Sequence, residues 1–247
     1  MIKIKTKEEI KNISKAGEIL SEVAEVLRKH IKVGVTTKEL DAIAEQEFDK
    51  RGVVSAFKGY RGFPASICSS VNEEVVHGIP GERKLSEGDL LSIDLGIKLD
   101  GYYADMAFTQ AVGKIKPELK RLVNITKEAL AKGIRQAKID RRVYDISHAI
   151  QSYVEAAGFS VVREFVGHGI GRELHEEPQI PNFGRPNTGE KITEGMVFAI
   201  EPMVNMGGWE VDILDNGWTA VTKDKMPSCH FEHTVAVLKD GPRILTQ

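Results

Sequence analysis

Two aspartates lie on either side of a predicted tight turn in the stretch 90–105. Asp94 and Asp105 stand in apolar runs separated by Asp100-Gly101, which is a strong β-hairpin signal. A four-residue loop would set the two carboxylates directly opposite each other, and a two-residue loop would set them on a diagonal of the same face. Because two neighbouring carboxylates repel each other, the hairpin predicts a proton or a cation between them. The alternative is two surface aspartates beside a turn.

Three further candidate ligands lie in the second half of the chain. His168 stands among glycines, which let a loop bring a ligand close to the backbone. Glu201 ends an apolar strand-like run and is followed by Pro202, which stops a strand. A carboxylate in that place is paired or bound to a metal when it is buried. Glu232 lies inside another strand-like run. A flexible loop around His168 and a solvent-facing position for Glu232 are the alternatives.

Together these residues supply four carboxylates and one imidazole. Oxygen ligands with a single nitrogen suit a pair of divalent ions, such as Mn, Fe, Co or Zn, that share carboxylates. A structural zinc site needs more sulfur or nitrogen. Because a pair of bound metal ions makes hydroxide available at neutral pH, this ligand set predicts hydrolytic chemistry.

The composition excludes several other functions. The 34 basic and 36 acidic residues leave a net charge of -2, and no basic block indicates a nucleic-acid partner. No apolar run is long enough to span a membrane, and the N-terminal segment has no apolar signal core. Cys68 and Cys229 make no disulfide framework, so we expect reduced thiols in a cytoplasmic protein.

The elements that must position the candidate ligands are predicted from apolar spacing and capping signals. Helices are expected at 6–30 and from 36 to just before Gly52, each opened by a Thr-x-x-Glu capping box, and again at 117–134 and about 146–158. Strand-like runs with Gly and Pro follow each helix pair. This repeated order predicts one α+β domain of two similar halves, with a site where the halves meet. The strands expected in the second half are 197–201, 219–223 and 231–238.

The candidate ligands and the segments around them, taken in their order along the chain, resemble the motifs of the type I methionine aminopeptidases. These are metalloaminopeptidases with the pita-bread fold. The short segment between His175 and Glu201 leaves no room for the helical insertion of the type II enzymes. The resemblance covers essentially the whole chain and implies a single catalytic metallopeptidase domain over residues 1–247, with an antiparallel sheet covered by helices and no N-terminal extension. The motifs that carry it are Asp94, Asp105, His168, Glu201 and Glu232, with the segments 72–80, 167–171 and 174–178.

By this resemblance, each ligand has a role at a dinuclear metal centre. Asp94 would hold one ion, and His168 and Glu201 would hold the other. Asp105 and Glu232 would bridge the two ions. Glu201 would also accept a proton from the water that attacks the scissile carbonyl.

The resemblance also assigns the surroundings of the metals. His77 and His175 would contact the substrate and steady the intermediate, and two ordinary polar histidines are the alternative. A monovalent cation is expected near Asn72, Glu74 and Ser228. An apolar and aromatic pocket suits the thioether of a methionine substrate. The residues that would line it are Tyr60, Phe63, Cys68, His77 and Trp218.

Three positions at the edge of this pocket depart from the commonest pattern of the family. Phe63 stands where tyrosine is usual, Phe57 where some relatives have cysteine, and Leu174 where many have phenylalanine. None of the three is an expected metal ligand. We therefore expect them to affect fine substrate preference and not the reaction.

The function implied by the resemblance is removal of the initiator methionine from nascent polypeptides when the second residue is small. The enzyme would act in the cytoplasm, at the ribosome, as a monomer, without a specific nucleic acid or a membrane as partner. Two alternatives stay open. A proline-directed peptidase of the same fold, a prolidase or aminopeptidase P, would carry a large N-terminal domain. A non-catalytic pita-bread protein that binds peptides would have lost metal ligands.

Overall fold

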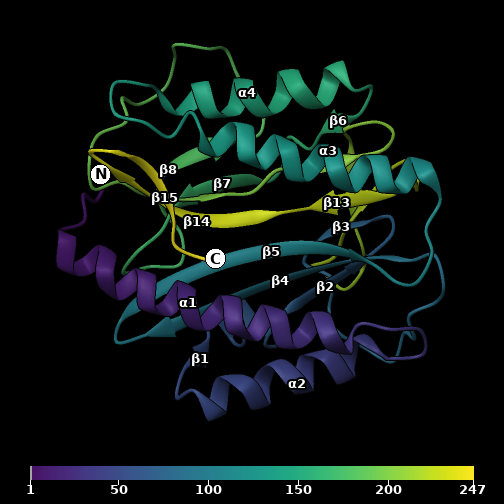
Figure 1. Cartoon of the computed structure of the whole chain (residues 1–247). Helices are drawn as coiled ribbons and strands as arrows, with labels where there is room; N and C mark the ends of the chain where they lie inside the picture. The colour runs from purple at the N-terminus through teal and green to yellow at the C-terminus, as the bar shows by residue number, and fades with distance from the viewer. Residues whose placement is uncertain (1) are drawn as a thin grey trace.

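Four long helices and a set of strands make up the part of the chain that the computed structural model describes, residues 2–247 (Figure 1). Met1, with which the predicted domain begins, lies outside the described residues. The helices are α1 (Lys7–His30), α2 (Thr37–Lys50), α3 (Pro117–Ile134) and α4 (Val143–Ala156), with the 3-10 helix η1 (Tyr60–Gly62). The strands are β1 (Val54–Ser55), β2 (Cys68–Val71), β3 (Glu74–Val76), β4 (Leu90–Leu99), β5 (Tyr102–Ala111), β6 (Ser160–Val161), β7 (Val166–Gly169), β8 (Glu176–Pro181), β9 (Val197–Ile200), β10 (Met203–Asn205), β11 (Val211–Ile213), β12 (Ala220–Thr222), β13 (Ser228–His230), β14 (Glu232–Leu238) and β15 (Gly241–Ile244).

Most of the strands form one antiparallel sheet through the middle of the molecule. Over residues 2–247 this sheet has nine strands, in the order β1-β4-β5-β14-β9-β7-β8, with β2 beside β4 and β15 beside β14. Two smaller sheets have the orders β13-β10-β6 and β11-β12-β3. In the large sheet, β5 from the first half of the chain pairs with β14 from the second, where Glu232 lies opposite Ala107. The two halves therefore share one sheet.

The helices follow the same division. Helix α1 lies beside β4 and β5 and α2 lies beside α1 and β1, whereas α3 and α4 lie beside the strands of the second half (Figure 1). The expected order of two helices followed by strands, repeated once, is confirmed, and so is the α+β class. No helix in the described part of the chain is long and apolar enough to cross a membrane.

The helix boundaries follow local capping signals. Thr6 and Thr36 cap α1 and α2, and in each case the glutamate three residues later completes the predicted capping box. Pro117 opens α3, as predicted. Helix α4 begins earlier than predicted, because the Asp145 carboxylate accepts the backbone N–H of Arg142 at 2.9 Å and so caps an additional turn.

The hairpin of β4 and β5 has the two-residue loop. Asp100 and Gly101 both have positive φ, of 49° and 83°, which is the backbone of a type I′ turn. In the resulting register Asp94 lies opposite Ala107, and Asp105 lies opposite Gly96. The two aspartates are therefore diagonal neighbours on one face of the hairpin, as predicted for a loop of this length.

Side chains along β4 and β5 point alternately to the two faces of the sheet, one packed in the hydrophobic core and the other carrying the candidate ligands. On β4, Ile93 and Leu95 are fully buried in the main hydrophobic core, which also contains α1 residues such as Leu20. Asp94 lies between them in sequence and so points to the opposite face. On β5, Met106 belongs to the same core, and Asp105 beside it points away from the helices. The packing of the helices thus fixes the face on which the carboxylates gather.

Candidate metal centre

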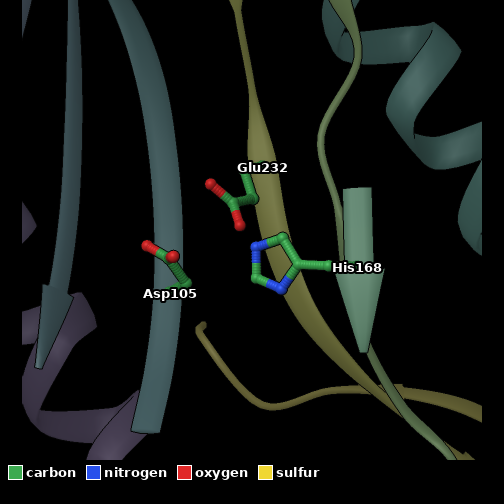
Figure 2. Close-up of side chains that lie close together, drawn as sticks. All are labelled: Asp105, His168 and Glu232. Atoms are coloured by element: carbon green, nitrogen blue, oxygen red, sulfur yellow. The ribbon is translucent and has the colours of Figure 1, made fainter. Parts of the chain in front are cut away.

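The five predicted ligands line one cavity of about 310 Å³. Asp94 comes from β4, Asp105 from β5, Glu232 from the start of β14 and His168 from β7. Glu201 directly follows β9. Because these strands are neighbours in the sheet, side chains on one face converge. Asp105, His168 and Glu232 each offer a ligand atom, and these atoms lie within 4.8 Å of one another. Figure 2 shows the three side chains grouped between neighbouring strands of the sheet.

Several carboxylate oxygens in this cluster have no partner among the described residues. Oδ1 of Asp94, Oδ1 of Asp105 and Oε1 of Glu232 are buried and make no hydrogen bond. Burial raises the pKa of Asp94 to about 7. Burial and the neighbouring carboxylates raise the pKa of Asp105 and of Glu232 well above the usual range. Orphaned, mutually repelling carboxylates at neutral pH are the expected surroundings of a bound cation.

His168 presents a lone pair to the same cluster. Its Nδ1 lies 2.9 Å from the carbonyl oxygen of Gly169, which can only accept, so Nδ1 carries the proton. Burial lowers the pKa of His168 to about 3, so the ring is neutral and Nε2 is bare. This Nε2 faces Oε1 of Glu201 at 3.5 Å. Two acceptors face each other there, as expected when both bind one metal ion.

The donor set therefore fits a metal. Four carboxylates and one neutral imidazole, oriented by a hydrogen bond from its other nitrogen, suit divalent ions bound mainly through oxygen. Both cysteines are protonated thiols at neutral pH, because burial raises the pKa of Cys68 and of Cys229. A thiolate-rich structural zinc site does not match this arrangement.

The residues expected to bind substrate lie around the same cavity. All six of them line it, along with Phe57 and Leu174, which depart from the family pattern. Phe63 and Trp218 pack edge to face, with ring centroids 5.1 Å apart, and form an aromatic wall. The six residues are Tyr60, Phe63, Cys68, His77, His175 and Trp218.

The two histidines that are expected to contact substrate differ in their surroundings. His77 follows β3 with a positive φ of 59°, and burial lowers its pKa to about 4. His175 lies on the loop between β7 and β8 and packs against His168, with ring centroids 4.3 Å apart and the rings tilted by 58°. Partial burial and the cation of Arg61 lower the pKa of His175. Both imidazoles are therefore neutral at neutral pH.

Three residues at the site were not predicted from the sequence. Phe165 and Arg61 line the cavity, and Phe165 packs edge to face on His77 at 5.2 Å. His230 is buried, its Nε2 has no hydrogen-bond partner among residues 2–247, and it lies 3.8 Å from Oε2 of Glu201. The only sequence signals were proximity to other motifs, since His230 precedes Glu232 by two positions and Phe165 directly precedes the glycine-rich loop.

The residues expected near a monovalent cation lie outside this cavity, with Asn72 on the β2–β3 turn, Glu74 at the start of β3 and Ser228 on β13. The backbone N–H of Ser228 donates to the carbonyl oxygen of Asn72 at 2.8 Å. The Glu74 carboxylate accepts the N–H of Val71 at 2.7 Å and pairs with Arg83 at 3.1 Å. Asn72 and Ser228 thus lie side by side, and the cation stays a prediction.

Comparisons with known proteins agree with this geometry. The sequence matches metallopeptidase family M24 over residues 11–239. It is 54% identical to a methionine aminopeptidase of Clostridium perfringens, over 100% of this chain and 99% of that protein. The crystal structure of methionine aminopeptidase from Rickettsia prowazekii superimposes with a TM-score of 0.99 at 41% identity and full coverage of both chains. The predicted pita-bread fold is thereby confirmed.

A more distant solved structure bears on the proline-peptidase alternative. The prolidase from Pyrococcus furiosus is similar to this chain with a TM-score of 0.81 and 25% identity. The match covers 99% of this chain but 65% of the prolidase. The prolidase thus has the same fold, and a substantial part of the prolidase chain lies outside the match.

Proposed function

Because this chain belongs to metallopeptidase family M24, we propose that it removes the N-terminal methionine of nascent polypeptides by metal-dependent hydrolysis when the second residue is small. One observation carries the proposal. The carboxylate cluster and an apolar, aromatic pocket share a single cavity, with Asp105 and Glu232 in the cluster and Phe63 and Trp218 in the pocket wall. A methionine side chain held in that pocket leaves its peptide bond beside the cluster.

We propose that two divalent ions bind in this cavity. Asp94 would hold one ion, His168 and Glu201 would hold the other, and Asp105 and Glu232 would be shared by the two. Co, Mn, Fe and Zn all accept this mixture of oxygen and nitrogen ligands. When bound, the ions supply Lewis acidity and a water activated at neutral pH. The orphaned oxygens of Asp94, Asp105 and Glu232 support this assignment.

The chain's own residues bind the substrate and move the proton. Phe63, Trp218 and the protonated thiol of Cys68 enclose the methionine side chain. Glu201 lines the same cavity, and its carboxylate accepts the proton that the attacking water loses. His77 and His175, both neutral, donate hydrogen bonds to the substrate and steady the negative charge that develops on the carbonyl oxygen.

A single domain over residues 1–247, active as a monomer, is part of the proposal. The family match covers most of the chain. Asp94 and Asp105 come from the first half and His168, Glu201 and Glu232 from the second, so neither half carries a complete site. All five ligands come from one chain, so a second copy is not needed. We also propose action in the cytoplasm at the ribosome, where nascent N-termini emerge, and a monovalent cation beside Asn72, Glu74 and Ser228.

Peptide hydrolysis tests the proposed function. With Mn or Co supplied, we expect release of free methionine from Met-Gly-Phe and little release from Met-Ile-Phe. Ala-Pro-Phe should stay intact. Cleavage of the Ala-Pro peptide in preference to Met-Gly-Phe would favour the proline-directed alternative, and cleavage of no peptide with the metals present would favour a peptide-binding protein.

A further inference from the structure

Tyr60, in the wall of the cavity, contacts His175, which is expected to bind substrate. The phenol oxygen of Tyr60 lies 2.9 Å from Nδ1 of His175, although the two residues belong to distant parts of the chain. Their ring centroids are 5.3 Å apart, and the rings are tilted by 39°. Both side chains line the cavity that holds the metal ligands. Tyr60 therefore contacts the substrate-binding machinery through its hydroxyl group, in addition to lining the methionine pocket.

The direction of this hydrogen bond decides where His175 carries its proton. An ordinary histidine has a pKa of about 6.5, so at pH values above about 7 the ring of His175 is mostly neutral and bears a single N–H. A phenol is a stronger donor than a neutral imidazole, and its oxygen is a weaker acceptor than the imidazole nitrogen. The hydroxyl of Tyr60 therefore donates to Nδ1, and the proton of the imidazole lies on Nε2.

We propose that Tyr60 is a positioning residue, whose hydroxyl donates to Nδ1 of His175 and so keeps a hydrogen-bond donor at Nε2 for the substrate carbonyl. This inference rests on the proposed function, in which His175 contacts the substrate. As the carbonyl carbon is attacked, its oxygen gains negative charge, and a donor already in place stabilises that charge without reorganisation. In the other tautomer, Nε2 would present a lone pair to the same oxygen and repel it.

The backbone around Tyr60 holds the hydroxyl in place. Three of its near neighbours, Gly59, Arg61 and Gly62, have φ values of 85°, 49° and 89°. A non-glycine residue such as Arg61 keeps a left-handed backbone only where the surroundings impose it. The N–H of Tyr60 donates to the carbonyl oxygen of Phe57 at 2.8 Å, which closes the turn. The turn therefore offers a fixed donor to His175.

Tyr60→Phe separates the two roles of this residue, because it removes the hydroxyl and keeps the ring. Loss of a direct transition-state donor costs about a hundredfold or more in kcat, and for loss of its orientation we expect about tenfold. KM for a Met-Gly tripeptide should stay within about twofold, since uniform binding by the ring is retained. The matched control is Phe63→Leu, which alters an apolar wall residue without a hydroxyl and should raise KM more than it lowers kcat. An unchanged kcat in Tyr60→Phe would overturn the proposal.

A double-mutant cycle tests whether the hydroxyl acts through His175. In a His175→Ala background, Tyr60→Phe should cause no further loss of kcat, because no imidazole remains to be oriented. Equal losses in the two backgrounds would mean that the hydroxyl acts on something else, and the proposal would be wrong.

Nitrogen NMR of the zinc-loaded enzyme with isotope-labelled histidine reports the tautomer independently of activity. We expect an unprotonated Nδ1 and a protonated Nε2 on His175, and a mixture of tautomers in Tyr60→Phe with an unchanged melting temperature. A protonated Nδ1 in the unsubstituted enzyme overturns the inference. If that enzyme releases no methionine, the proposed function fails, whereas the NMR result still decides whether the hydrogen bond sets the tautomer.

Discussion

Asp105 lies in the closest group of the candidate metal ligands, and its charge affects the pKa of the neighbouring carboxylates. It belongs to the close group with His168 and Glu232, and it is the neighbour that most raises the pKa of Glu232 after burial itself. Its own Oδ1 is orphaned. A carboxylate that faces so many others repels all of them unless cations lie between, so its loss should disturb the whole site.

Asp105→Ala should therefore abolish turnover and weaken the binding of both metal ions. Two ions that share a bridging carboxylate lose a ligand together, and calorimetric titration with Mn or Co measures each affinity. Asp212→Ala, at an exposed position on β11, is the control and should bind two ions as the unsubstituted enzyme does. Two ions bound with undiminished affinity in Asp105→Ala would remove Asp105 from the site.

His77→Ala and His175→Ala should keep the metals and lose rate. Each removes a neutral donor at the cavity wall, and loss of one such donor typically lowers kcat by about a hundredfold or more. Steady-state kinetics with a Met-Gly peptide gives kcat, and metal titration of the same samples gives the affinities. His148→Ala, on the exposed surface of α4, should be silent. Near-normal kcat in both active-site variants would make them ordinary polar histidines.

Single residues were predictable where their chemistry leaves a local mark. Asp94 and Asp105 flank a turn that the sequence displays, and Glu201 ends an apolar run at a proline. His230 has no such local signal, because what brings it to the site is a contact at 3.8 Å with Glu201. Glu201 follows β9, whereas His230 ends β13. Arg61 is similar, since only the fold brings its charge near His175.

At the scale of elements, the turn between β4 and β5 sets the diagonal placement of the two aspartates. Gly101→Ala forces a side chain onto a residue with a φ of 83°, which should cost about 1–2 kcal/mol of folding free energy. Urea denaturation measures this loss. Gly81→Ala is the control, because Gly81 does not have a positive φ and a Cβ there would meet its nearest atom at 3.9 Å. Equal stability of the two variants would mean that the turn is not strained by Cβ.

Helix starts and the hairpin were predictable because their signals are local, as the capping boxes at Thr6 and Thr36 illustrate. The pairing of β5 with β14 was not. It joins Ala107 to Glu232, which are separated by about half of the chain, and neither strand carries a sequence pattern that identifies its partner. Cross-strand pairing depends on the packing of side chains that are distant in sequence, so a site where two halves meet was predictable only in outline.

At the scale of the whole molecule, one sheet closed by helices holds mutually repelling charges in its interior. The core face of β4 and β5 packs on α1, and on the opposite face Asp105 is buried and Asp94 is half-buried among the other carboxylates of the site. The folding free energy of the metal-free protein must therefore include the cost of the buried carboxylates. That cost depends on pH, because protonation removes it.

The metal-free protein should lose stability as the pH rises above about 6.5. Unfolded Asp and Glu titrate near about 4, whereas burial raises the pKa of Asp94 to about 7 in the folded chain. The contribution of Asp94 to the free energy of unfolding is thus fully present below a pH of about 4 and is lost as the pH rises through the pKa of the folded chain. Burial lowers the pKa of His77 to about 4 and that of His168 to about 3, so these groups act in the opposite direction. Their contribution is complete above the unfolded value of about 6.5 and is lost only in acid.

The carboxylates therefore decide the trend above a pH of about 6.5, and the two buried thiols, whose pKa is also raised, act in the same direction near a pH of about 8.5. The melting temperature of chelator-treated protein should fall over the interval between these two pH values, and saturating Mn should remove the fall, because a bound cation balances the ionised carboxylates. Glu232→Gln cannot ionise at that position and should melt with a shallower dependence on pH in chelator. Equal melting temperatures at the two ends of the interval would contradict the prediction. They would mean that, without metal, the cluster opens to water and the carboxylates ionise at little cost.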